Sequence, residues 1–364
     1  MIHTDIAIVG GGPAGLRAAI MAAESGAKVI IIDRNSQLGG QLIKQTHMFF
    51  GSQKQYASKR GIDIANILIS ELDKHKENIT VMLDSTVIGL YEDRVLTVDQ
   101  GGKYIKIKPN TIIIATGASE KFQAFPNNDL PGIYGAGAVQ TLMNVYGVAP
   151  GESVFMVGAG NIGLIVSYQL MQAGIKVKGV ICRGPKFGGY AVHASKLKRL
   201  GVPVMPSHKV VYAHGKDKLE KITLIKLDEN KKEIPGTEFD IEVDVLCIAT
   251  GLTPLAELLW QMGCEMKYIS ELSGHVPLRD KNLMTSLDGI YVAGDVAGIE
   301  EASSAMVEGA LAGLCAAKAA GYIHPDYEAL VEDCHKQLYD LRSGPEGEAI
   351  RKGLSKAELK EVGL

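Results

Sequence analysis

Two stretches of the sequence repeat one pattern, and this repeat limits the folds open to the chain. Residues 5–34 (DIAIVGGGPAGLRAAIMAAESGAKVIIIDR) and 153–183 (SVFMVGAGNIGLIVSYQLMQAGIKVKGVICR) each hold an apolar run, a glycine turn, a helical segment and a second apolar run. The glycines are Gly10, Gly12 and Gly15 in the first stretch, and they recur 148 residues later. A strand, a G-x-G-x-x-G turn and a helix in this order predict a dinucleotide-binding unit.

A second pair of segments closes each unit. TIIIATGAS at 111–119 and VLCIATGLT at 245–253 are apolar runs that end in a Thr-Gly turn. Alternating residues at 86–108 and 208–243 predict a β-meander between each glycine unit and its closing strand. A late segment with a short strand ending at Gly294-Asp295, followed by a long Ala/Gly-rich helix, is then left over. We expect it to return to the first unit.

The sequence therefore predicts an α/β fold of two Rossmann-like dinucleotide-binding domains, the second inserted in the first. The expected first domain comprises residues 1–120 and 280–325, and the second comprises residues 151–279. Residues 121–150 are expected to link the two, and residues 326–364 to form a C-terminal tail. The 42 glycines and 46% hydrophobic residues are typical of such a fold.

The residue types in the first unit indicate how a dinucleotide is held. Gly10 permits the tight turn, Gly12 lets the backbone approach a pyrophosphate, and Gly15 lets the helix pack against the sheet. The helix N-terminus offers free N–H groups to the phosphates. Asp33 ends the second strand, where it can accept hydrogen bonds from an adenosine ribose, and Asp295 can receive a ribityl or ribose hydroxyl.

The predicted binding residues come from the turns, the strand ends and the late segment. For the first unit they are Gly10, Gly12, Pro13, Ala14, Gly15, Asp33, Arg34, Gly40, Gln41, Val87, Ala115, Thr116, Gly117, Gly294, Asp295 and Ala302. For the second unit they are Gly158, Gly160, Asn161, Ile162, Gly163 and Arg183. No catalytic residue and no metal ligand is predicted.

In their order along the chain, these motifs resemble those of flavoproteins with two dinucleotide-binding domains, which include thioredoxin reductase and ferredoxin reductases. In that group the motifs GGGPAG, ATG and AGD belong to FAD, and GGQL at 39–42 resembles the flavin-side segment of thioredoxin reductases. The resemblance covers roughly residues 4–320. It implies a thioredoxin-reductase- or ferredoxin-reductase-like fold with FAD in the first unit.

Three further segments resemble a narrower group, the FAD-binding α-type subunits of multi-subunit amine and amino-acid dehydrogenases. They are THMFFGS at 46–52, LPGIYGAGAVQTLM at 130–143 and GGYAVHASKLKRLGVP at 188–203. Members act on proline, hydroxyproline, opines or sarcosine, and the hydrogen cyanide synthase subunit is a relative. The resemblance implies a hetero-oligomer with a flavoprotein subunit of the amino-acid-oxidase type.

The second unit lacks the expected ribose acid. Aligning Gly26 with Gly174 places Ile181 opposite Asp33, with no carboxylate within two residues. Arg183 could bind a 2′-phosphate, which would favour NADP, or it could simply be solvated. We expect this unit to hold NAD(P) or another adenine nucleotide, or to be empty, and not to work as an NAD(H) hydride site.

The cysteines restrict the chemistry. The five cysteines contain no CxxC or CxxxxC pair, so reduction of a disulfide through such a pair is excluded. Many α-type relatives carry a cysteine-rich C-terminal module for a [2Fe–2S] cluster, whereas this chain has Cys334 alone in its tail. The resemblance therefore implies a separate iron–sulfur protein. Scattered, reduced cysteines and the lack of a signal peptide or membrane span predict a cytoplasmic protein.

The tail admits two interpretations. Leu330, Val331, Leu338 and Leu341 follow near-helical spacing. Such a segment is either a solvated amphipathic helix or a docking element for a partner. The formal net charge of -3 gives no reason to expect a nucleic-acid partner.

Two other segments also stay open. Tyr190, His193 and Lys196 are either surface or core polar residues, or they line the second nucleotide site or a contact between subunits. Phe49 and Phe50 are either core residues or a wall beside the flavin.

Three functional classes follow. The favoured one is an FAD-dependent, electron-transferring subunit of a dehydrogenase that oxidises a secondary amine or amino acid. The alternative is a free-standing NAD(P)H:acceptor oxidoreductase without a redox disulfide. A structural nucleotide-binding subunit with no electron transfer is the third, and the intact flavin motifs argue against it.

Overall fold

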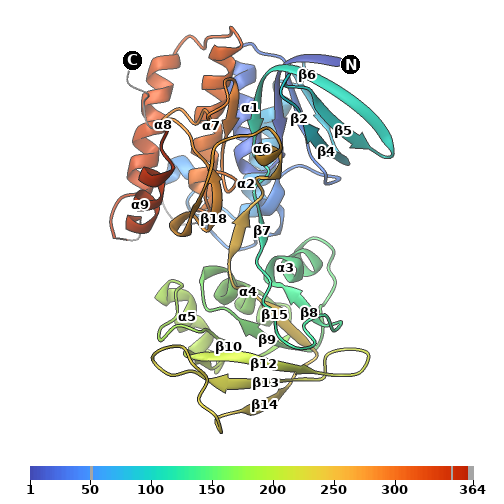
Figure 1. Ribbon diagram of the computed structural model, residues 1–364, viewed down its shortest axis with the longest axis vertical. Helices are drawn as coiled ribbons and strands as arrows, with labels where there is room; N and C mark the ends of the chain where they lie inside the picture. The colour runs from blue at the N-terminus through green and yellow to red at the C-terminus, as the bar shows by residue number, and fades with distance from the viewer. Residues whose placement is uncertain (50–51, 346, 360–364) are drawn as a thin grey trace. The chain divides into compact units, whose positions relative to one another are not determined.

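The computed structural model describes residues 1–49, 52–345 and 347–359, and the chain divides into two compact units (Figure 1). Unit 1 comprises residues 1–43, 48–119 and the described residues from 252 onward. Unit 2 comprises residues 44–47 and 120–251. Each unit is built on a largely parallel sheet with helices, so the predicted α/β fold with one unit inserted in the other is confirmed.

The sheet of unit 1 has the order β3-β2-β1-β6-β5-β4, with β19 paired to β6. Its strands are β1 (Ile2–Val9), β2 (Val29–Ile32), β3 (Ile79–Met82), β4 (Ser85–Leu90), β5 (Leu96–Gln100), β6 (Lys103–Ile114) and β19 (Ile290–Val292). The strands β1, β2, β3, β6 and β19 pair in parallel, whereas β5 pairs antiparallel with both of its neighbours. All four residues of β2 are buried, as expected for a parallel strand covered on both faces.

Helices cover this sheet and extend beyond it. They are α1 (Pro13–Glu24), α2 (Gly61–Asp73), α6 (Glu257–Gln261), α7 (Ala302–Ala319), α8 (Tyr327–Leu341) and α9 (Glu348–Ala357). The helix α7 lies between α1 and α8 (Figure 1). A Cβ atom on Gly309 would lie 2.1 Å from the Ala14 oxygen, and one on Gly313 would lie 2.3 Å from the Ala18 oxygen. The close packing of α7 on α1 therefore depends on these two glycines.

Unit 2 has a parallel five-stranded sheet of order β11-β10-β9-β15-β8. Its strands are β8 (Ile133–Gly135), β9 (Ser153–Val157), β10 (Lys176–Ile181), β11 (Val204–Met205) and β15 (Val245–Ile248). The helices α3 (Ala136–Asn144), α4 (Asn161–Gln172) and α5 (Ala191–Arg199) share one core cluster with it. The antiparallel meander β12 (His208–His214), β13 (Lys221–Lys226) and β14 (Phe239–Glu242) contributes to another.

Several short elements complete the chain. They are the 3-10 helices η1 (Gly40–Lys44), η2 (Gln53–Gln55) and η3 (Ser270–Leu272), and the strands β7 (Ala118–Glu120), β16 (Leu252–Pro254), β17 (Met266–Ile269) and β18 (Gly274–Pro277). The strands β7 and β16 pair where the chain passes between the units, and β17 pairs with β18.

The compact units differ from the expected domain boundaries in several places, and residues 44–47 of the expected first domain lie in unit 2. The expected linker 121–150 contains β8 and α3, and β8 is an edge strand of the sheet in unit 2. Residues 252–279 lie in unit 1 instead of the second domain, because Ala256, Leu259 and Cys264 are buried with the core residues of β4 and β5. Residues 121–150 and 252–279 have no strong periodic pattern in the sequence, so their places in the two units could not be read from it.

The tail also belongs to unit 1. Leu338 is buried, and Leu330, Val331 and Leu341 pack against the core cluster that includes α1 and α7. Leu338 is therefore a core residue and the other three are half-buried against that core, so the interpretation of these four side chains as a docking element for a partner is wrong. The helix α9 packs on η3 through Ile350 and Leu354, so it too is part of the unit.

Candidate dinucleotide-binding sites and the family

The first glycine turn joins β1 to α1. Gly10 has φ +109°, and a Cβ atom there would lie 2.3 Å from the Ala115 oxygen. A Cβ atom on Gly15 would lie 1.8 Å from the Gly10 oxygen, so no side chain fits at either position. A Cβ atom on Gly12 would meet only the Gly40 Cα atom, at 3.9 Å. Open space therefore remains in front of Gly12, where a phosphate could approach the helix.

The start of α1 leaves its N–H groups without side-chain caps. Gly12 is the N-cap, and Pro13 and Ala14 are the first helical residues. Proline suits this position because it has no N–H to satisfy. The positive end of the helix dipole and the free N–H groups can therefore receive an anion.

The loop after β2 comes back to the glycine turn. The N–H of Gly39 donates to the Gly11 oxygen at 2.9 Å. Gly40 has φ +54°, and a Cβ atom there would lie 2.7 Å from the Gly12 Cα atom. Gln41 follows in η1 and is exposed. The structure thus places Gly40 and Gln41 next to the phosphate turn.

Asp33 directly follows β2 and is held in place by three donors. Its Oδ2 accepts the Gly11 N–H at 2.6 Å, and its Oδ1 accepts the Asn35 N–H at 2.8 Å and the Asn35 Nδ2 at 2.9 Å. The neighbouring Arg34 is exposed. Two carboxylate oxygens have about four acceptor sites, so Asp33 can still accept from a ribose hydroxyl.

The closing strand β6 ends beside this turn. The Ala115 N–H donates to the Val9 oxygen at 2.8 Å, and the Thr116 hydroxyl donates to the Leu255 oxygen at 2.6 Å. Gly117 has φ +75°, with open space around its Cα. Val87 lies further along β4. The first residue of this strand, Ser85, donates its N–H to the backbone carbonyl oxygen of Asp33.

The late segment supplies a second carboxylate. After β19, Gly294 has φ +78°, and a Cβ atom on it would lie 3.1 Å from the Ala14 Cβ atom. Asp295 is half-buried. Loss of solvation first, and then the charges of nearby carboxylates, raise its pKa to about 7, although the Glu300 N–H opposes this rise. Ala302 is the first residue of α7.

The glycine turn, Asp33 and the Thr116-Gly117 strand end therefore gather at the carboxyl end of one sheet, and the Gly294-Asp295 turn lies against the start of α1. This is the edge at which parallel α/β sheets bind their ligands. Open backbone at Gly12, a carboxylate at Asp33 and a second at Asp295 fit the phosphates and the hydroxyl groups of a dinucleotide.

The second glycine turn has the same backbone construction. A Cβ atom on Gly158 would lie 2.0 Å from the Ala249 oxygen, and one on Gly163 would lie 2.0 Å from the Gly158 oxygen. Gly160 faces open space. The helix α4 begins with Asn161 and Ile162, of which Ile162 is exposed. The phosphate turn of unit 2 is therefore intact.

The position opposite Asp33 is Cys182, so the alignment with Ile181 is wrong by one residue. Gly10 donates its N–H to the Ile32 oxygen, and Gly158 donates its N–H to the Ile181 oxygen, both at 2.8 Å. The register of β10 shifts between Val177 and Gly179, and this irregularity adds one residue to the strand. A thiol thus replaces the carboxylate, and Arg183 corresponds to Arg34.

Cys182 is a poor substitute for Asp33. Burial raises the pKa of its thiol, and the Gly184 oxygen accepts its weak hydrogen bond. A neutral thiol gives no charged acceptor for a ribose hydroxyl. Arg183 itself is exposed and lines a pocket of about 570 Å³ with Phe122 and Phe125.

The repeat extends further than the glycine turns. The N–H of Gly188 donates to the Ala159 oxygen at 3.1 Å, as Gly39 does to Gly11. A Cβ atom on Gly189 would lie 2.9 Å from the Asn161 nitrogen, so this loop also returns to its phosphate turn. The sequence carries the signal as LGGQ and FGGY, which stand 149 residues apart because of the extra residue in β10.

The two open segments can now be located. The N–H of Tyr190 donates to the Asn161 side chain at 2.8 Å, so Tyr190 lies beside the second phosphate turn. His193 is buried in α5, and the Lys196 ammonium lies 5.1 Å from the ring centre of Tyr168. Phe49 packs against the core of unit 1, whereas Phe50 lies outside the described residues.

All five cysteines are free thiols. Cys182 is half-buried, and the other four are buried. Within residues 1–49, 52–345 and 347–359, no cluster of three or more His, Cys, Asp or Glu side chains is arranged to hold a metal ion. In the same part of the chain, no helix has both the length and the apolar character needed to cross a bilayer.

Curated relatives resemble most of this chain. It is 28% identical to the A subunit of opine oxidase from Agrobacterium tumefaciens over 86% of this chain and 65% of that protein. It is 28% identical to the alpha subunit of sarcosine oxidase from Corynebacterium sp. over 88% of this chain and 33% of that protein. It is 27% identical to the HcnB subunit of hydrogen cyanide synthase from Pseudomonas protegens over 84% of this chain and 69% of that protein. The chain thus spans about two thirds of two of these relatives and one third of the other.

Solved structures share the fold. The L-proline dehydrogenase of P. horikoshii has a TM-score of 0.70 at 26% identity, over 91% of this chain and 59% of that one. The thioredoxin reductase of T. acidophilum has a TM-score of 0.71 at 22% identity, over 87% of this chain and 99% of that one. A family profile described as pyridine nucleotide-disulphide oxidoreductase matches residues 4–309. The chain belongs to this family.

Proposed function

We propose that this chain is the electron-transferring flavoprotein subunit of a multi-subunit dehydrogenase that oxidises a secondary amine or an amino acid. The observation that carries the proposal is an intact first glycine turn, with Asp33 beside it, in a chain whose five cysteines are all unpaired thiols. Its site can hold a flavin, but the sequence has no CxxC pair to exchange electrons with a disulfide substrate. The electrons must therefore pass to or from another group.

The relatives support a subunit role. The opine oxidase, sarcosine oxidase and HcnB relatives are each named as subunits of larger enzymes. The opine and sarcosine enzymes are named for amine-containing substrates, and the structural relative is a proline dehydrogenase. We propose two partners, a flavoprotein subunit of the amino-acid-oxidase type and a separate iron–sulfur protein. A cytoplasmic location stays a prediction.

In this proposal each part of the first site has one task. The N–H groups at Gly12 and the start of α1 would hold the pyrophosphate of FAD, and Asp33 would accept from its adenosine ribose. Asp295 would bind a hydroxyl of the ribityl chain, and the N-terminus of α7 at Ala302 would face the ring edge. Bound FAD supplies the two-electron redox chemistry. The remaining predicted residues, which include Val87 and Gly117, would shape the walls of the site.

The second unit would hold an adenine nucleotide by its phosphates. Gly158, Gly160 and Gly163 keep the turn, and Asn161 and Ile162 begin the helix behind it. Without an acid at Cys182, the unit gains little from ribose hydroxyls. We therefore propose that NADH does not deliver hydride efficiently through this unit.

The test is dye-linked oxidation of proline, hydroxyproline, sarcosine and opines. It compares the isolated chain with the complex recovered on the tagged chain at native expression level. The proposal predicts turnover by the complex only. Turnover of any substrate by the isolated chain contradicts the subunit role.

The alternative is a free-standing NAD(P)H:acceptor oxidoreductase, which the intact turn at Gly158–Gly163 favours. It predicts that NADPH reduces the flavin rapidly without a partner. It also predicts that Arg183→Ala removes this activity. Both results together would replace the proposal.

A further inference from the structure

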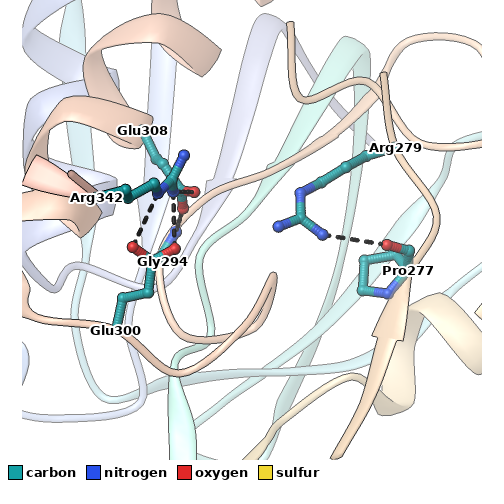
Figure 2. A network of polar contacts seen from close by, with 6 residues as sticks. All are labelled: Pro277, Arg279, Gly294, Glu300, Glu308 and Arg342. Carbon is teal, nitrogen blue, oxygen red and sulfur yellow. Dashed lines mark hydrogen bonds and ion pairs between the residues drawn. The ribbon is translucent and has the colours of Figure 1, made fainter. Parts of the chain in front are cut away.

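A buried group of charged side chains lies behind the Gly294-Asp295 turn (Figure 2). Arg342, at the C-terminal end of α8, donates from Nε to Glu300 Oε2 at 2.9 Å and from Nη2 to Glu300 Oε1 at 2.7 Å. It also donates from Nη2 to Glu308 Oε1 at 2.5 Å. One guanidinium thus binds two carboxylates, one of them in the bidentate geometry that arginine forms best.

The group is shielded from water. The exposed fractions of the side chains are 13% for Arg342, 10% for Glu300 and 4% for Glu308. A second guanidinium, that of Arg279, is 4% exposed and extends toward the same carboxylates (Figure 2). A carboxylate buried to this extent needs a partner, since removing one member of a buried pair leaves a charge without compensation.

Both residues act on the turn itself, Glu308 through its carboxylate and Glu300 through its backbone. Glu308 uses its other oxygen, Oε2, to accept the N–H of Gly294 at 2.8 Å. The backbone N–H of Glu300 donates to the Asp295 carboxylate. Gly294 has a positive φ of +78°, so its N–H direction is set by this unusual conformation. Arg342 therefore fixes the two residues that fix Gly294 and Asp295.

The local charge makes this arrangement sensitive. Asp295, Glu300, Glu301 and Glu308 lie close enough for their charges to repel. Without Arg342, the carboxylates of Glu300 and Glu308 would lose the guanidinium that holds them and would be free to turn away. Such a movement removes or weakens the hydrogen bond between Glu308 and Gly294.

We propose that Arg342 is a positioning residue of the flavin site, which acts through Glu300 and Glu308 on the Gly294-Asp295 turn. The inference rests on the proposed flavin-binding role of this turn. Arg342 lies beyond residues 4–309, the part of the chain that the family profile matches. The tail helix α8 thus completes a site whose other residues come from the family core.

The experiment compares Arg342→Met with Arg342→Lys and with a matched control, Lys54→Met. The control removes a surface ion pair, in which the Lys54 ammonium lies 2.7 Å from the carboxylate of Asp333 in α8. The measurements are the Kd of FAD for the apoprotein, the visible absorption spectrum of the bound flavin and its midpoint potential.

We expect Arg342→Met to weaken FAD binding at least about 10-fold and to shift both the spectrum and the potential, because a broken charged hydrogen bond has effects of this size. Arg342→Lys, which restores the charge but not the bidentate contact, should recover part of each. Lys54→Met should match the wild type. Wild-type affinity, spectrum and potential in Arg342→Met would overturn the proposal.

If Arg342→Met does not fold, Arg342→Lys and Glu300→Gln decide the outcome. Both should fold and shift the spectrum, and wild-type behaviour in both overturns the proposal. A wild-type protein that cannot bind FAD at all would instead refute the flavin assignment. Substrate turnover by the isolated chain would refute only the subunit role.

Discussion

The two units share one phosphate turn and differ in the groups around it. In both, a Cβ atom on the third glycine would lie within 2.0 Å of the oxygen of the first, and the middle glycine faces open space. In both, a di-glycine loop returns to the turn. Unit 1 has Asp33 after its second strand, whereas unit 2 has Cys182. The glycines make both units able to receive phosphates, and the acid after the second strand is the first difference between them.

The strand next to each closing strand shows a second difference. In unit 1, β19 pairs with β6, and the chain then passes through Asp295 before it reaches α7. In unit 2, β8 pairs with β15 and runs directly into α3 at Ala136. Unit 2 therefore has no residue between β8 and α3 in the place of Asp295, and the carboxylate at the start of α3 is that of Glu120, which accepts the Gly137 N–H at 2.7 Å. Both units have the backbone of a dinucleotide site, and only unit 1 has an aspartate after its second strand.

The largest expected effect is the loss of flavin on Gly12→Val. Gly12 and Gly160 have ordinary φ values of −78° and −81°, so a side chain acts by filling space rather than by backbone strain. We expect purified Gly12→Val to be colourless, because the valine blocks the approach of the pyrophosphate. The matched variant Gly160→Val should remain yellow. The visible spectrum of each purified protein checks this, and a yellow Gly12→Val would break the comparison.

The next effect concerns the tail, which only unit 1 possesses. Leu338 is 5% exposed and packs in the core with α7, so Leu338→Ala should lower the free energy of unfolding by about 2–5 kcal/mol. The adjacent Tyr339 is 74% exposed, and Tyr339→Ala should change it by less than about 0.5 kcal/mol. Unfolding in urea, monitored through the release of the flavin, measures the free energy of unfolding of both variants. Equal effects would show that α8 is not part of the core of unit 1.

Cys182→Asp should make unit 2 more like unit 1. A charged hydrogen bond to a ribose hydroxyl contributes about 1.5–3 kcal/mol, which corresponds to about 10–100-fold in the Kd of NAD. Calorimetric titration compares Cys182→Asp with the wild type, and Cys182→Ser is the uncharged control. Unchanged affinity in Cys182→Asp would mean that the missing acid is not what limits the second unit.

The smallest effect is a dependence on pH that comes from unit 1. Burial first, and then nearby carboxylates, raise the pKa of Asp295 to about 7 in the cofactor-free protein. An unfolded chain has an aspartate pKa near about 3.9. Between these values the folded state holds a proton that the unfolded state has lost, so stability falls as the pH rises from about 4 to 7.

Asp295→Asn should flatten this fall in the melting temperature of the apoprotein between about pH 5 and pH 7. Asp244 of unit 2 is the control. Burial raises its pKa, but hydrogen bonds from Glu152 and Ser153 outweigh this and leave the pKa lowered. Its contribution is therefore lost only as the pH falls below its ordinary range. If the melting temperature of Asp295→Asn falls with pH as steeply as that of the wild type, Asp295 does not have the raised pKa assigned to it.

Much of the first site could be predicted from the sequence, because glycine and an acid at fixed spacing have few alternative uses. Gly10 and Gly15 are required by contacts with neighbouring backbone, and Asp33 follows the strand directly. The extra residue in β10 leaves no composition signal, and its trace in the sequence is the 149-residue offset of LGGQ and FGGY, against 148 for the glycine turns. Because of this extra residue, the position that corresponds to Asp33 is Cys182 and not Ile181.

The polar network behind the first site was also beyond the sequence. Arg342 meets Glu300 and Glu308 from positions 42 and 34 residues away. No local pattern relates a residue at the end of one helix to the turn before another. The tail was misread for a related reason, because near-helical spacing of Leu330 and Leu338 indicates an apolar face but not what covers it.

Anaerobic stopped-flow reduction of the bound flavin by NADH tests the difference between the units most directly. The flavin site proposed for unit 1 and a second site without a ribose acid predict a yellow protein that NADH bleaches slowly. The rate should rise with NADH without saturating at micromolar concentration. Rapid bleaching that saturates at micromolar NADH would contradict the account, because it would require a working nicotinamide site in unit 2.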